Sequence, residues 1–238
     1  MYHDVFSLDP SESGLASSLY KIDVASFEQQ LIELSKLAAE GISLSLTFDD
    51  GGSSFYTIIA DLLEKYHFKG LFFVATAYIG KPGFLSERDL LELDRRGHAI
   101  GTHSHTHPDN MTLLSNDEIN EEWSESVRIL SRILGHQVSV GSIPNGYESD
   151  VIIKAANLAG VSDLYTSLPS VNYRKFLGVT IHGRFVVLSS TGIEGIKKIC
   201  TSAGYRRTLL VKWYLLFFPK KLLGNKYETV KNLVHKWL

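Results

Sequence analysis

Short apolar runs alternate with longer amphipathic stretches along most of the chain. The apolar runs are typical of buried strands, and the stretches between them place apolar residues three and four positions apart, as helices do. Strands are predicted at residues 43–48, 69–75, 98–102, 138–143, 164–167 and 179–188. Helices are predicted at residues 26–40, 54–65, 86–96, 115–134, 149–159 and 192–203. This alternation predicts an α/β fold around a mainly parallel sheet, either a barrel or a doubly wound sheet.

Nothing along the chain divides this pattern into two domains. No internal repeat and no Pro/Gly-rich linker interrupts it, and 238 residues are ordinary for one barrel or one large α/β domain. We therefore expect one domain at residues 1–205, followed at residues 206–238 by a basic, aromatic, helical C-terminal extension.

Composition supports a folded core and gives no general case for nucleic-acid binding. Apolar residues make up 44% of the chain, and its formal net charge is −2. The charge is unevenly spread, because residues 206–238 hold eight Lys and Arg but a single acidic residue, Glu228. The extension is therefore the one segment whose charge favours an anionic partner, and the preceding residues are net acidic.

Cysteine use and hydropathy bear on the compartment. Cys200 is the only cysteine, so no disulfide can form within the chain. The first residues lack the basic segment and apolar run of a secretory signal, and no apolar stretch approaches the roughly 18–20 residues that cross a bilayer. These observations lead us to expect a cytoplasmic protein.

Two adjacent carboxylates follow the first predicted strand. The segment Thr-Phe-Asp-Asp-Gly at residues 47–51 places Asp49 and Asp50 at the carboxyl end of that strand, where active sites of parallel α/β proteins collect. Adjacent carboxylates repel each other unless a cation or a guanidinium offsets their charge. Taken alone, the pair is also explained by one Asp that caps the next helix and one that is solvated.

Three histidines within five residues follow the third predicted strand, in the segment His-Ser-His-Thr-His at residues 103–107. Imidazole is the commonest metal ligand at neutral pH, although histidines in a polar loop can also bond only to the backbone. One Asp and two His make a three-ligand set that leaves a coordination position for water, as in catalytic zinc sites. Together the two segments predict a catalytic metal site.

The pairing, order and strand-end position of these segments resemble the polysaccharide deacetylase family, also called carbohydrate esterase family 4. The likeness runs from about residue 42 to about residue 206 and implies a distorted, incomplete (β/α) barrel. By this resemblance Asp49 is the general base, whereas Asp50, His103 and His107 hold a divalent metal, for which we expect zinc. His105 is not a ligand in this pattern. The implied reaction is metal-dependent removal of acetyl groups from N-acetylated sugars of a glycan or of a lipid-linked glycan precursor.

The third motif of the family is altered in this chain. The family reads Arg-x-Pro-x-Gly, whereas residues 142–146 read Ser-Ile-Pro-Asn-Gly, so Ser142 replaces the Arg that pairs with the catalytic base. The resemblance also implies that the backbone N–H of Asn145, after the Pro, binds the oxyanion. A fourth family motif with Asp and Trp is not recognisable.

The fifth motif, a Leu-rich strand that ends in a catalytic His, is loosely matched by Thr-Ile-His at residues 180–182. His182 is therefore the candidate general acid, with an ordinary barrel histidine as the alternative. Arg184 lies two residues later on the same predicted strand, so both side chains should face one side. We predict that Arg184 supplies the guanidinium missing at Ser142, with a surface or salt-bridged Arg as the alternative. Among the other histidines, only His3 remains a candidate for the pocket.

Two other functions fit parts of the pattern. Metal-dependent amidohydrolases carry a His-x-His pair like His103 and His105, but after the first strand of the barrel, whereas here the pair follows the third strand. A catalytically impaired, sugar-binding member of the same fold would explain the missing motif Arg, although every proposed metal ligand is retained.

The C-terminal extension allows two interpretations. Residues 209–218 read Leu-Leu-Val-Lys-Trp-Tyr-Leu-Leu-Phe-Phe, and Pro219 follows. One interpretation is a buried terminal helix. The other is a basic amphipathic element on anionic lipid, which would place the protein at the inner membrane face. Pro219 is expected to break any helix there in two.

Overall fold

The computed structural model describes residues 1–9 and 13–223 of the chain. Within these residues a seven-stranded sheet forms the centre, in the order β3-β4-β5-β6-β7-β9-β8. The strands are β3 (Leu46–Phe48), β4 (Gly70–Val74), β5 (Ala99–Thr102), β6 (Val140–Ser142), β7 (Asp163–Tyr165), β8 (Tyr173–Phe176) and β9 (Val179–His182). All neighbouring pairs are parallel except β8 and β9. The predicted α/β class with a mainly parallel sheet is confirmed.

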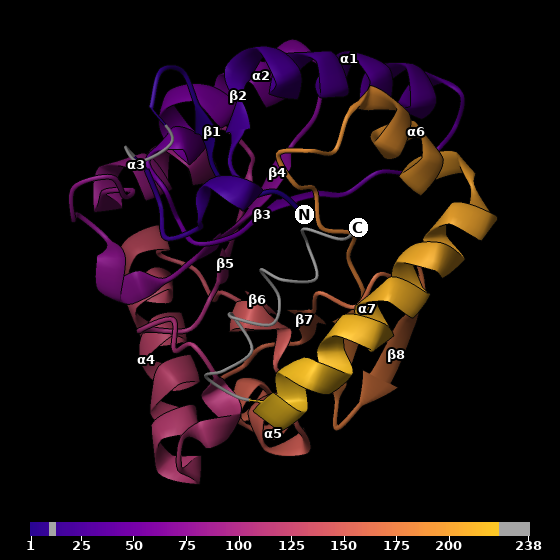
Figure 1. The fold of residues 1–238 in the computed structure, drawn as a ribbon. Helices are drawn as coiled ribbons and strands as arrows, with labels where there is room; N and C mark the ends of the chain where they lie inside the picture. The colour runs from indigo at the N-terminus through magenta and orange to yellow at the C-terminus, as the bar shows by residue number, and fades with distance from the viewer. Residues whose placement is uncertain (10–12, 224–238) are drawn as a thin grey trace.

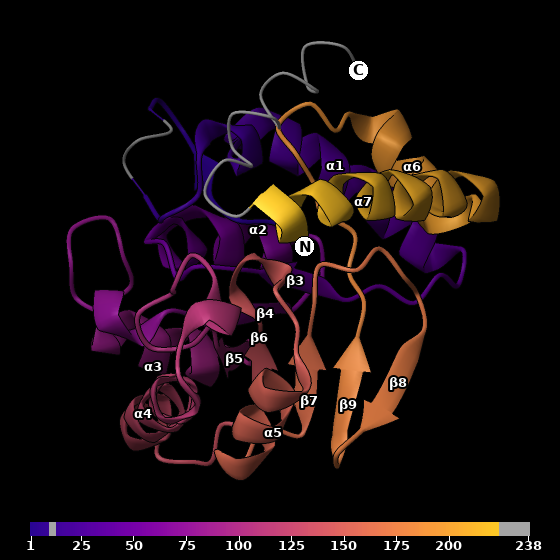
Figure 2. The same ribbon diagram turned by 60° about the horizontal axis from the view of Figure 1, so that its bottom comes forward.

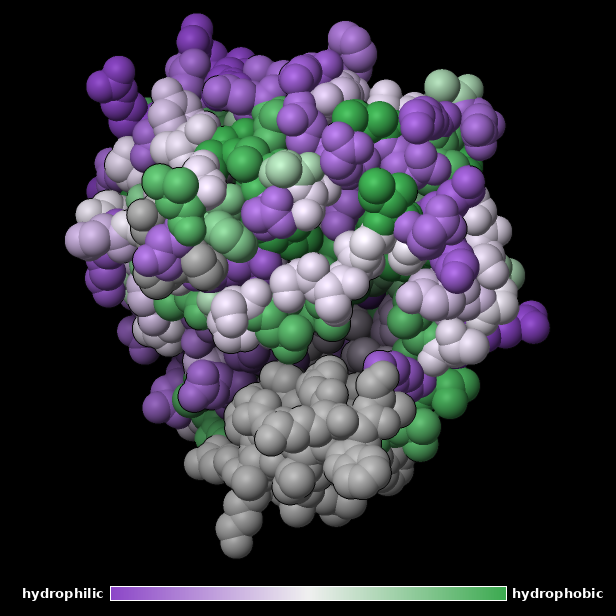
Figure 3. Space-filling model, turned by 45° about the horizontal axis from the view of Figure 1, so that its top comes forward, coloured by the Kyte–Doolittle hydropathy of each residue, from purple (hydrophilic) through white to green (hydrophobic). Residues whose placement is uncertain are grey.

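Helices surround this strongly curled sheet on its outer side (Figure 1). They are α1 (Val24–Ala39), α2 (Ala60–Lys65), α3 (Glu87–Arg95), α4 (Asn116–Leu134), α5 (Asp150–Leu158), α6 (Ile193–Thr201) and α7 (Ala203–Leu223). Helices α3, α4 and α5 pack in sequence, α1 contacts α2, and α6 contacts both α7 and α1. On the face drawn in Figure 3 the outer surface is largely hydrophilic, with apolar patches scattered through it.

The first residues of the chain lie between β3 and the segment that follows β9. Tyr2 pairs with Phe48 in parallel register; its N–H donates to the carbonyl of Thr47 at 2.7 Å. On the other side, the N–H of Val187 donates to the carbonyl of Met1 at 2.9 Å. The N-terminal segment therefore bridges the two sides of the curled sheet. A short parallel pair, β1 (Val5–Phe6) with β2 (Ile22–Asp23), follows it.

Two apolar clusters fill the space between the strands and the helices. The larger lies against α1, α2 and α3 and includes the ring contacts that join Tyr2, Phe27, Phe48, Phe55 and Phe72. The smaller lies between α4, α5 and strands β6, β7 and β9, around the fully buried Trp123. Truncating one such buried aromatic side chain to Ala typically costs about 3–5 kcal/mol, so the clusters hold the strand ends in place.

The strand predicted at residues 179–188 is shorter than expected. β9 ends at His182, where Gly183 follows so close to the neighbouring loop that a Cβ on it would lie 2.6 Å from the carbonyl oxygen of Leu168. The antiparallel partner β8 was not predicted, because its residues are mostly exposed and lack a buried stripe. Leu177 and Gly178, both with positive φ (48° and 81°), form the two-residue turn that joins β8 to β9.

Two helices also differ from expectation. The helix predicted at residues 54–65 starts with a π-helical turn at Phe55–Ile59 before α2 begins at Ala60. The C-terminal helix α7 continues through Pro219 to Leu223, so the expectation that Pro219 divides it is wrong. No described helix is both long and apolar enough to span a bilayer. The predicted extension thus starts inside α7, and residues 224–238 lie outside the described residues.

Candidate metal centre

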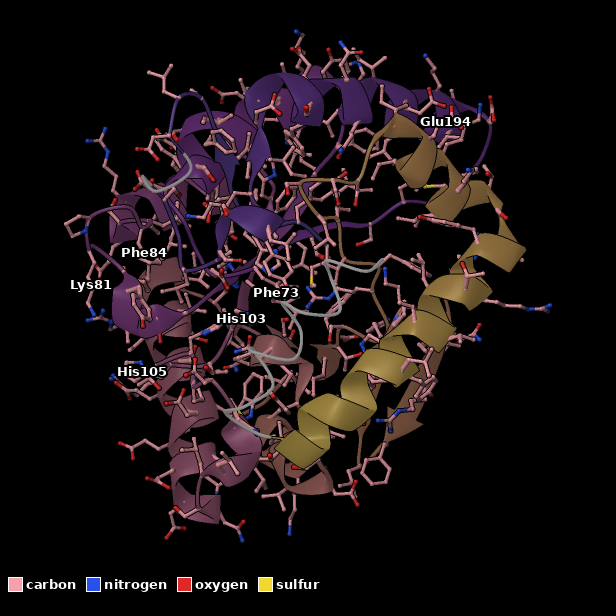
Figure 4. The ribbon with its side chains drawn as sticks, in the orientation of Figure 1. Phe73, Lys81, Phe84, His103, His105 and Glu194 are labelled. Carbon is pink, nitrogen blue, oxygen red and sulfur yellow. The ribbon has the colours of Figure 1, made fainter. Side chains whose placement is uncertain are left out.

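The carboxyl ends of β3, β5 and β6 bring the predicted residues together at one end of the barrel. Asp49 and Asp50 follow β3, His103 follows β5, and Ser142 is the last residue of β6. Figure 4 shows His103 near the centre of the ring of helices and His105 farther out, beside α4. The two Asp residues and His103 are at most 3% exposed. Groups so deeply buried require partners or a cation to offset the loss of hydration.

Asp50, His103 and His107 form a compact group of potential metal ligands. One ligand atom from each lies within 4.8 Å of the others. Oδ1 of Asp50 is 3.6 Å from Nε2 of His103 and 3.4 Å from Nε2 of His107. Ligand atoms about 2.0–2.1 Å from a tetrahedral zinc ion are about 3.3 Å apart, so these separations fit one ion. Two imidazoles and one carboxylate are also the donor set of a catalytic site with an open position.

The orientation of His103 suits metal binding. Its Nδ1 lies 2.8 Å from the carbonyl oxygen of Ser142. Because a carbonyl only accepts hydrogen bonds, Nδ1 must carry the hydrogen, which leaves the lone pair on Nε2, the atom that faces Asp50. Burial lowers the pKa of His103 to about 4, which favours the neutral imidazole that a metal requires. Burial also acts to lower the pKa of His107, but the hydrogen bond to Asp50 outweighs it and the pKa is raised.

A buried carboxylate on α4 holds the loop between the two histidine ligands. Oε2 of Glu122 accepts the backbone N–H groups of His105 and Thr106 at 2.9 and 2.8 Å, and its Oε1 accepts the Thr106 hydroxyl. Three donors on one carboxylate fix the course of the loop that presents His103 and His107. Sequence analysis missed Glu122. A signal was present, because Glu122 lies on the buried stripe of its helix between Ile119 and Trp123.

Left-handed backbone conformations are concentrated at this end of the barrel. Asp50, Ser104, His107 and Asn145 have φ values of 91°, 63°, 57° and 55°. Each such residue costs of order 1–3 kcal/mol unless the surrounding structure imposes it, and conformations of this kind gather at functional sites. Two of the three proposed metal ligands are thus aimed by strained backbone.

The Asp49 carboxylate is hydrogen-bonded by Arg184 and is not one of the three potential metal ligands. Nη1 of Arg184 donates to Oδ1 of Asp49 at 2.7 Å, and Nη2 donates to Oδ2 at 2.8 Å. Nη2 also donates to the Ser142 hydroxyl at 2.6 Å, and this hydroxyl donates to Oδ2 of Asp49 at 3.2 Å. Burial alone would raise the pKa of Asp49, but the guanidinium and His103 hold it well below its usual range. The predicted contact between Arg184 and Asp49 is present. The guanidinium lies beside Ser142, the residue that stands where the third family motif has an Arg.

The Arg184 guanidinium is itself fixed by its surroundings. It is 5.2 Å from the centre of the Phe73 ring and 5.8 Å from that of Tyr165, and Nε donates to the carbonyl of Thr166. Its side chain is 5% exposed. A buried cation with aromatic and carbonyl contacts is confined to one position, so it sets the orientation of the Asp49 carboxylate.

The two remaining predicted residues have different positions. Asn145 is exposed in the turn directly after β6, beside the strand end that carries Ser142. The His182 imidazole stacks on Tyr165 at 4.7 Å, and its Nε2 lies 2.9 Å from Oδ1 of Asp163. Within the described residues no hydrogen bond or ring contact joins His182 to the metal-ligand group. The His182 imidazole is therefore engaged by Asp163 and the Tyr165 ring, and none of its described contacts supports the expected role as general acid.

The His-x-His alternative is not supported by this arrangement. Nδ1 of His105 lies 2.9 Å from the Thr76 hydroxyl, and the group of ligand atoms contains His107 in place of His105. An amidohydrolase of the kind considered above would use His103 and His105 on the same ion.

Comparison with known proteins identifies related sequences. The profile of the polysaccharide deacetylase family matches residues 36–163, which is more than half of the chain. The peptidoglycan-N-acetylmuramic acid deacetylase of Bacillus subtilis is 29% identical over 134 residues, covering 56% of this chain and 49% of that protein. The peptidoglycan-N-acetylglucosamine deacetylase of Bacillus cereus is 30% identical over 94 residues, covering 39% and 32%. The matched part of the chain therefore spans about half the length of the first relative and about a third of the length of the second.

Solved structures share the fold. A Streptococcus pyogenes deacetylase determined in complex with acetate superimposes with a TM-score of 0.70 at 21% identity, covering 84% of this chain and 95% of that one. A polysaccharide deacetylase from Bacillus cereus superimposes with a TM-score of 0.72 at 18% identity, covering 84% and 67%. The strongly curled parallel sheet is therefore that of known polysaccharide deacetylases.

Proposed function

The chain belongs to the polysaccharide deacetylase family, and from that premise we propose that it is a metal-dependent hydrolase that removes acetyl groups from N-acetylated sugars. One observation carries the proposal. Asp50, His103 and His107 converge as potential ligands, while the adjacent Asp49 is bound by Arg184 and stays outside that group. Two neighbouring carboxylates with different partners suit two different roles.

The residues present fit a divalent ion, for which we propose zinc. Asp50, His103 and His107 would hold it, and their donor atoms are spaced for one ion. When bound, such an ion polarises an acetyl carbonyl and lowers the pKa of water from 15.7 toward about 7.

Asp49 is suited to act as the general base. Its carboxylate is kept ionised by Arg184 and His103, which together outweigh burial, so it can accept a proton from the water that attacks the acetyl carbonyl. General-base catalysis of this kind contributes roughly 10²–10⁴ in rate. The guanidinium also fixes which carboxylate oxygen faces the pocket, because both oxygens are hydrogen-bonded in a single geometry.

The backbone N–H of Asn145 is the proposed donor to the oxyanion that forms during the attack. Its place at the end of β6, with Pro144 before it and a left-handed φ, supports this assignment. Loss of one oxyanion donor typically costs about 3–4 kcal/mol in transition-state stabilisation. As the C–N bond breaks, the departing amine takes up the proton that Asp49 accepted from the water, so that acetate and the free amine are released. His182 has no part in this step, because its imidazole is bonded to Asp163 and stacked on Tyr165.

The alternative of a sugar-binding protein without turnover rested on the missing motif Arg. Since Arg184 binds both oxygens of Asp49, the group whose absence motivated that alternative is supplied from another strand.

The substrate and the compartment are further parts of the proposal. Two relatives are named for deacetylation of N-acetylmuramic acid and of N-acetylglucosamine in peptidoglycan, so we propose an N-acetylated glycan or its lipid-linked precursor as substrate. Helix α7 crosses the barrel end to which β7 and β9 point (Figure 2), the end that carries the metal centre. A basic helix there would suit work at the inner, cytoplasmic face of a membrane.

Acetate release tests this function. The purified, zinc-loaded chain should release acetate from oligomers of N-acetylglucosamine or from peptidoglycan fragments, and a chelator should abolish the release. Asp49→Asn should keep the metal and lose activity by at least about 10²-fold. A loaded protein that releases no acetate from any of these compounds would contradict the proposal.

A further inference from the structure

The turn at residues 49–54, which follows β3, is held at both ends by the N-terminal segment. At its start, the N–H of Asp49 donates to the carbonyl of Tyr2 at 3.1 Å. At its end, the Ser54 hydroxyl donates to Oδ1 of Asp4 at 2.7 Å. The N-terminal segment therefore fixes both ends of the turn that presents the proposed base and one proposed metal ligand.

The Asp4 carboxylate is the centre of a closed hydrogen-bond network. The Ser13 hydroxyl donates to the same Oδ1 at 2.6 Å and accepts the N–H of Ser54 at 3.2 Å. The Ser54 hydroxyl accepts the N–H of Val5 at 3.3 Å, and Nζ of the buried Lys21 donates to the carbonyl of Ser13. Because each hydroxyl both donates and accepts, the position of Ser54 depends on the one carboxylate oxygen that the two hydroxyls share.

The Asp4 carboxylate fits tightly between two glycines. A Cβ on Gly14 would lie 1.8 Å from Oδ2 of Asp4, and a Cβ on Gly52 would lie 1.9 Å from its Oδ1. Asp4 is 1% exposed, and its Oδ2 has no hydrogen-bond partner among the described residues. Burial of an unpaired carboxylate oxygen costs free energy, so this group calls for an explanation beyond the stability of the fold.

The turn beside this network has an unfavourable backbone. Asp50 and Gly51 have φ values of 91° and 90°. For Asp50, which has a side chain, such a conformation persists only where surrounding contacts impose it. The N–H of Ala75 donates to the carbonyl of Asp50 at 3.3 Å, and the N–H of Leu85 donates to that of Gly51 at 3.0 Å. The Asp4 network restrains the end of the same turn through side chains.

We propose that Asp4 is a positioning residue for the metal centre. Its carboxylate, through the two Ser hydroxyls, holds the turn after β3 in the conformation that aims Asp50 at the two histidine ligands. This role rests on the function proposed above, because it requires that these ligands bind a metal. Asp4 is not one of the potential ligands, so it acts on the metal only through the turn.

Two substitutions of Asp4 separate this role from other roles of a buried carboxylate. Asp4→Ala removes the shared acceptor. Asp4→Asn keeps an oxygen in the place of Oδ1, which receives both hydroxyls, and changes only the position of Oδ2, which has no partner. We expect zinc affinity to fall about 10- to 100-fold in the Ala variant, as for other residues that support metal ligands, and to stay within about fivefold of wild type in the Asn variant.

Cobalt in place of zinc provides a readout of ligand geometry, because the visible absorption of Co²⁺ depends on the arrangement of its ligands. The spectrum of the cobalt-loaded Asp4→Ala protein should differ from that of wild type, whereas Asp4→Asn should match wild type. Leu93→Ala is the destabilised control, because it truncates a fully buried side chain of α3. This control should melt at a lower temperature and keep the zinc affinity and the cobalt spectrum of wild type.

A further variant applies if Asp4→Ala does not fold. Ser54→Ala removes one of the two hydroxyls and leaves the carboxylate in place. It should change the cobalt spectrum in the same direction as Asp4→Ala. A wild-type spectrum in Ser54→Ala would overturn the positioning role without any measurement on Asp4→Ala.

The outcomes distinguish the two proposals. If wild type binds neither zinc nor cobalt, the proposed function and the role of Asp4 both fail. If wild type binds metal but releases no acetate, the function fails, and the zinc affinities and cobalt spectra still decide the role of Asp4. If Asp4→Ala has the affinity and spectrum of wild type, or if Asp4→Asn is as impaired as Asp4→Ala, only the role of Asp4 is overturned. The same holds if Leu93→Ala changes the cobalt spectrum as Asp4→Ala does, since the change would then follow from lost stability.

Discussion

Arg184 binds both carboxylate oxygens of Asp49 from a position 135 residues farther along the chain. The same guanidinium donates to the Ser142 hydroxyl, at the position where the family pattern has an Arg. The contact between catalytic carboxylate and guanidinium is thus kept, although the guanidinium comes from the segment after β9 and not from β6.

The first prediction concerns the pH dependence of activity. In wild type, burial acts to raise the pKa of Asp49, and Arg184 more than offsets it, so the base is ionised well below neutral pH. In Arg184→Met the largest influence that offsets burial is lost, and the pKa of Asp49 should rise. The acidic limb of the kcat/KM profile, where activity falls as Asp49 is protonated, should therefore move to higher pH. At neutral pH Asp49 stays ionised, but loss of the two hydrogen bonds that orient its carboxylate should lower kcat/KM roughly 10²-fold. An unchanged limb would show that Arg184 does not control the base.

The second tests whether the guanidinium can be supplied from either strand. Arg184→Ser should be strongly impaired, and Ser142→Arg added to it should restore at least about tenfold of the lost activity, because the Ser142 hydroxyl and the guanidinium lie 2.6 Å apart. Ser142→Arg alone should be poorly active, since two guanidinium groups would compete for one buried space. If the double variant is no more active than Arg184→Ser, a guanidinium at position 142 cannot replace the one at position 184.

The third concerns the metal. We expect one zinc ion per chain in wild type, measured by elemental analysis after dialysis, and none in the His103→Ala/His107→Ala double variant. His105→Ala is the matched control, because its imidazole bonds Thr76 and lies outside the ligand group. Stoichiometric zinc in the double variant would exclude this site.

The fourth concerns the loop between the ligands. Glu122→Gln replaces one carboxylate oxygen, which accepts hydrogen bonds, with an NH2 group that faces the loop donors. Zinc affinity should fall about 10- to 100-fold, as for other residues that support metal ligands. Glu125→Gln, on the same helix but bonded to exposed Arg128, should bind zinc as wild type does. Equal zinc affinities in the two variants would show that Glu122 does not support the metal ligands.

The fifth concerns α7 and anionic lipid. Arg207 and Lys212 are exposed on α7 beside exposed Val211, Tyr214 and Leu215. Each basic residue near an anionic surface contributes roughly 1 kcal/mol, so Arg207→Glu with Lys212→Glu should weaken binding to phosphatidylserine vesicles at least about tenfold at low salt. Added salt should abolish the difference.

The control for that measurement reverses two exposed lysines elsewhere, Lys36→Glu and Lys154→Glu, on α1 and α5. If the control variant loses as much binding as the α7 variant, or if wild type stays in the supernatant at low salt, α7 has no special role at a membrane.

Local sequence patterns determined the fold class and the candidate ligands. Buried strands and amphipathic helices have periodicities that a few neighbouring residues reveal. The segments at residues 47–51 and 103–107 each follow such a strand, and parallel strands place their carboxyl ends at one end of the sheet. The two carboxylates and the three histidines could therefore be expected at one site, and the resemblance to the family selected Asp50, His103 and His107 among them.

Side-chain direction within the barrel was decided by tertiary packing. His182 and Arg184 were expected on one side of one strand, yet β9 ends at His182, whose imidazole contacts Asp163 and Tyr165, whereas Arg184 binds Asp49. Glu122 gave a weak signal, because its role depends on a loop that is distant in sequence from its helix. The sequence by itself determined which residues lie at the end of which strand, since that depends on local backbone preference. Only the tertiary structure decided which polar atoms are left without partners, since that depends on every side chain that packs around them.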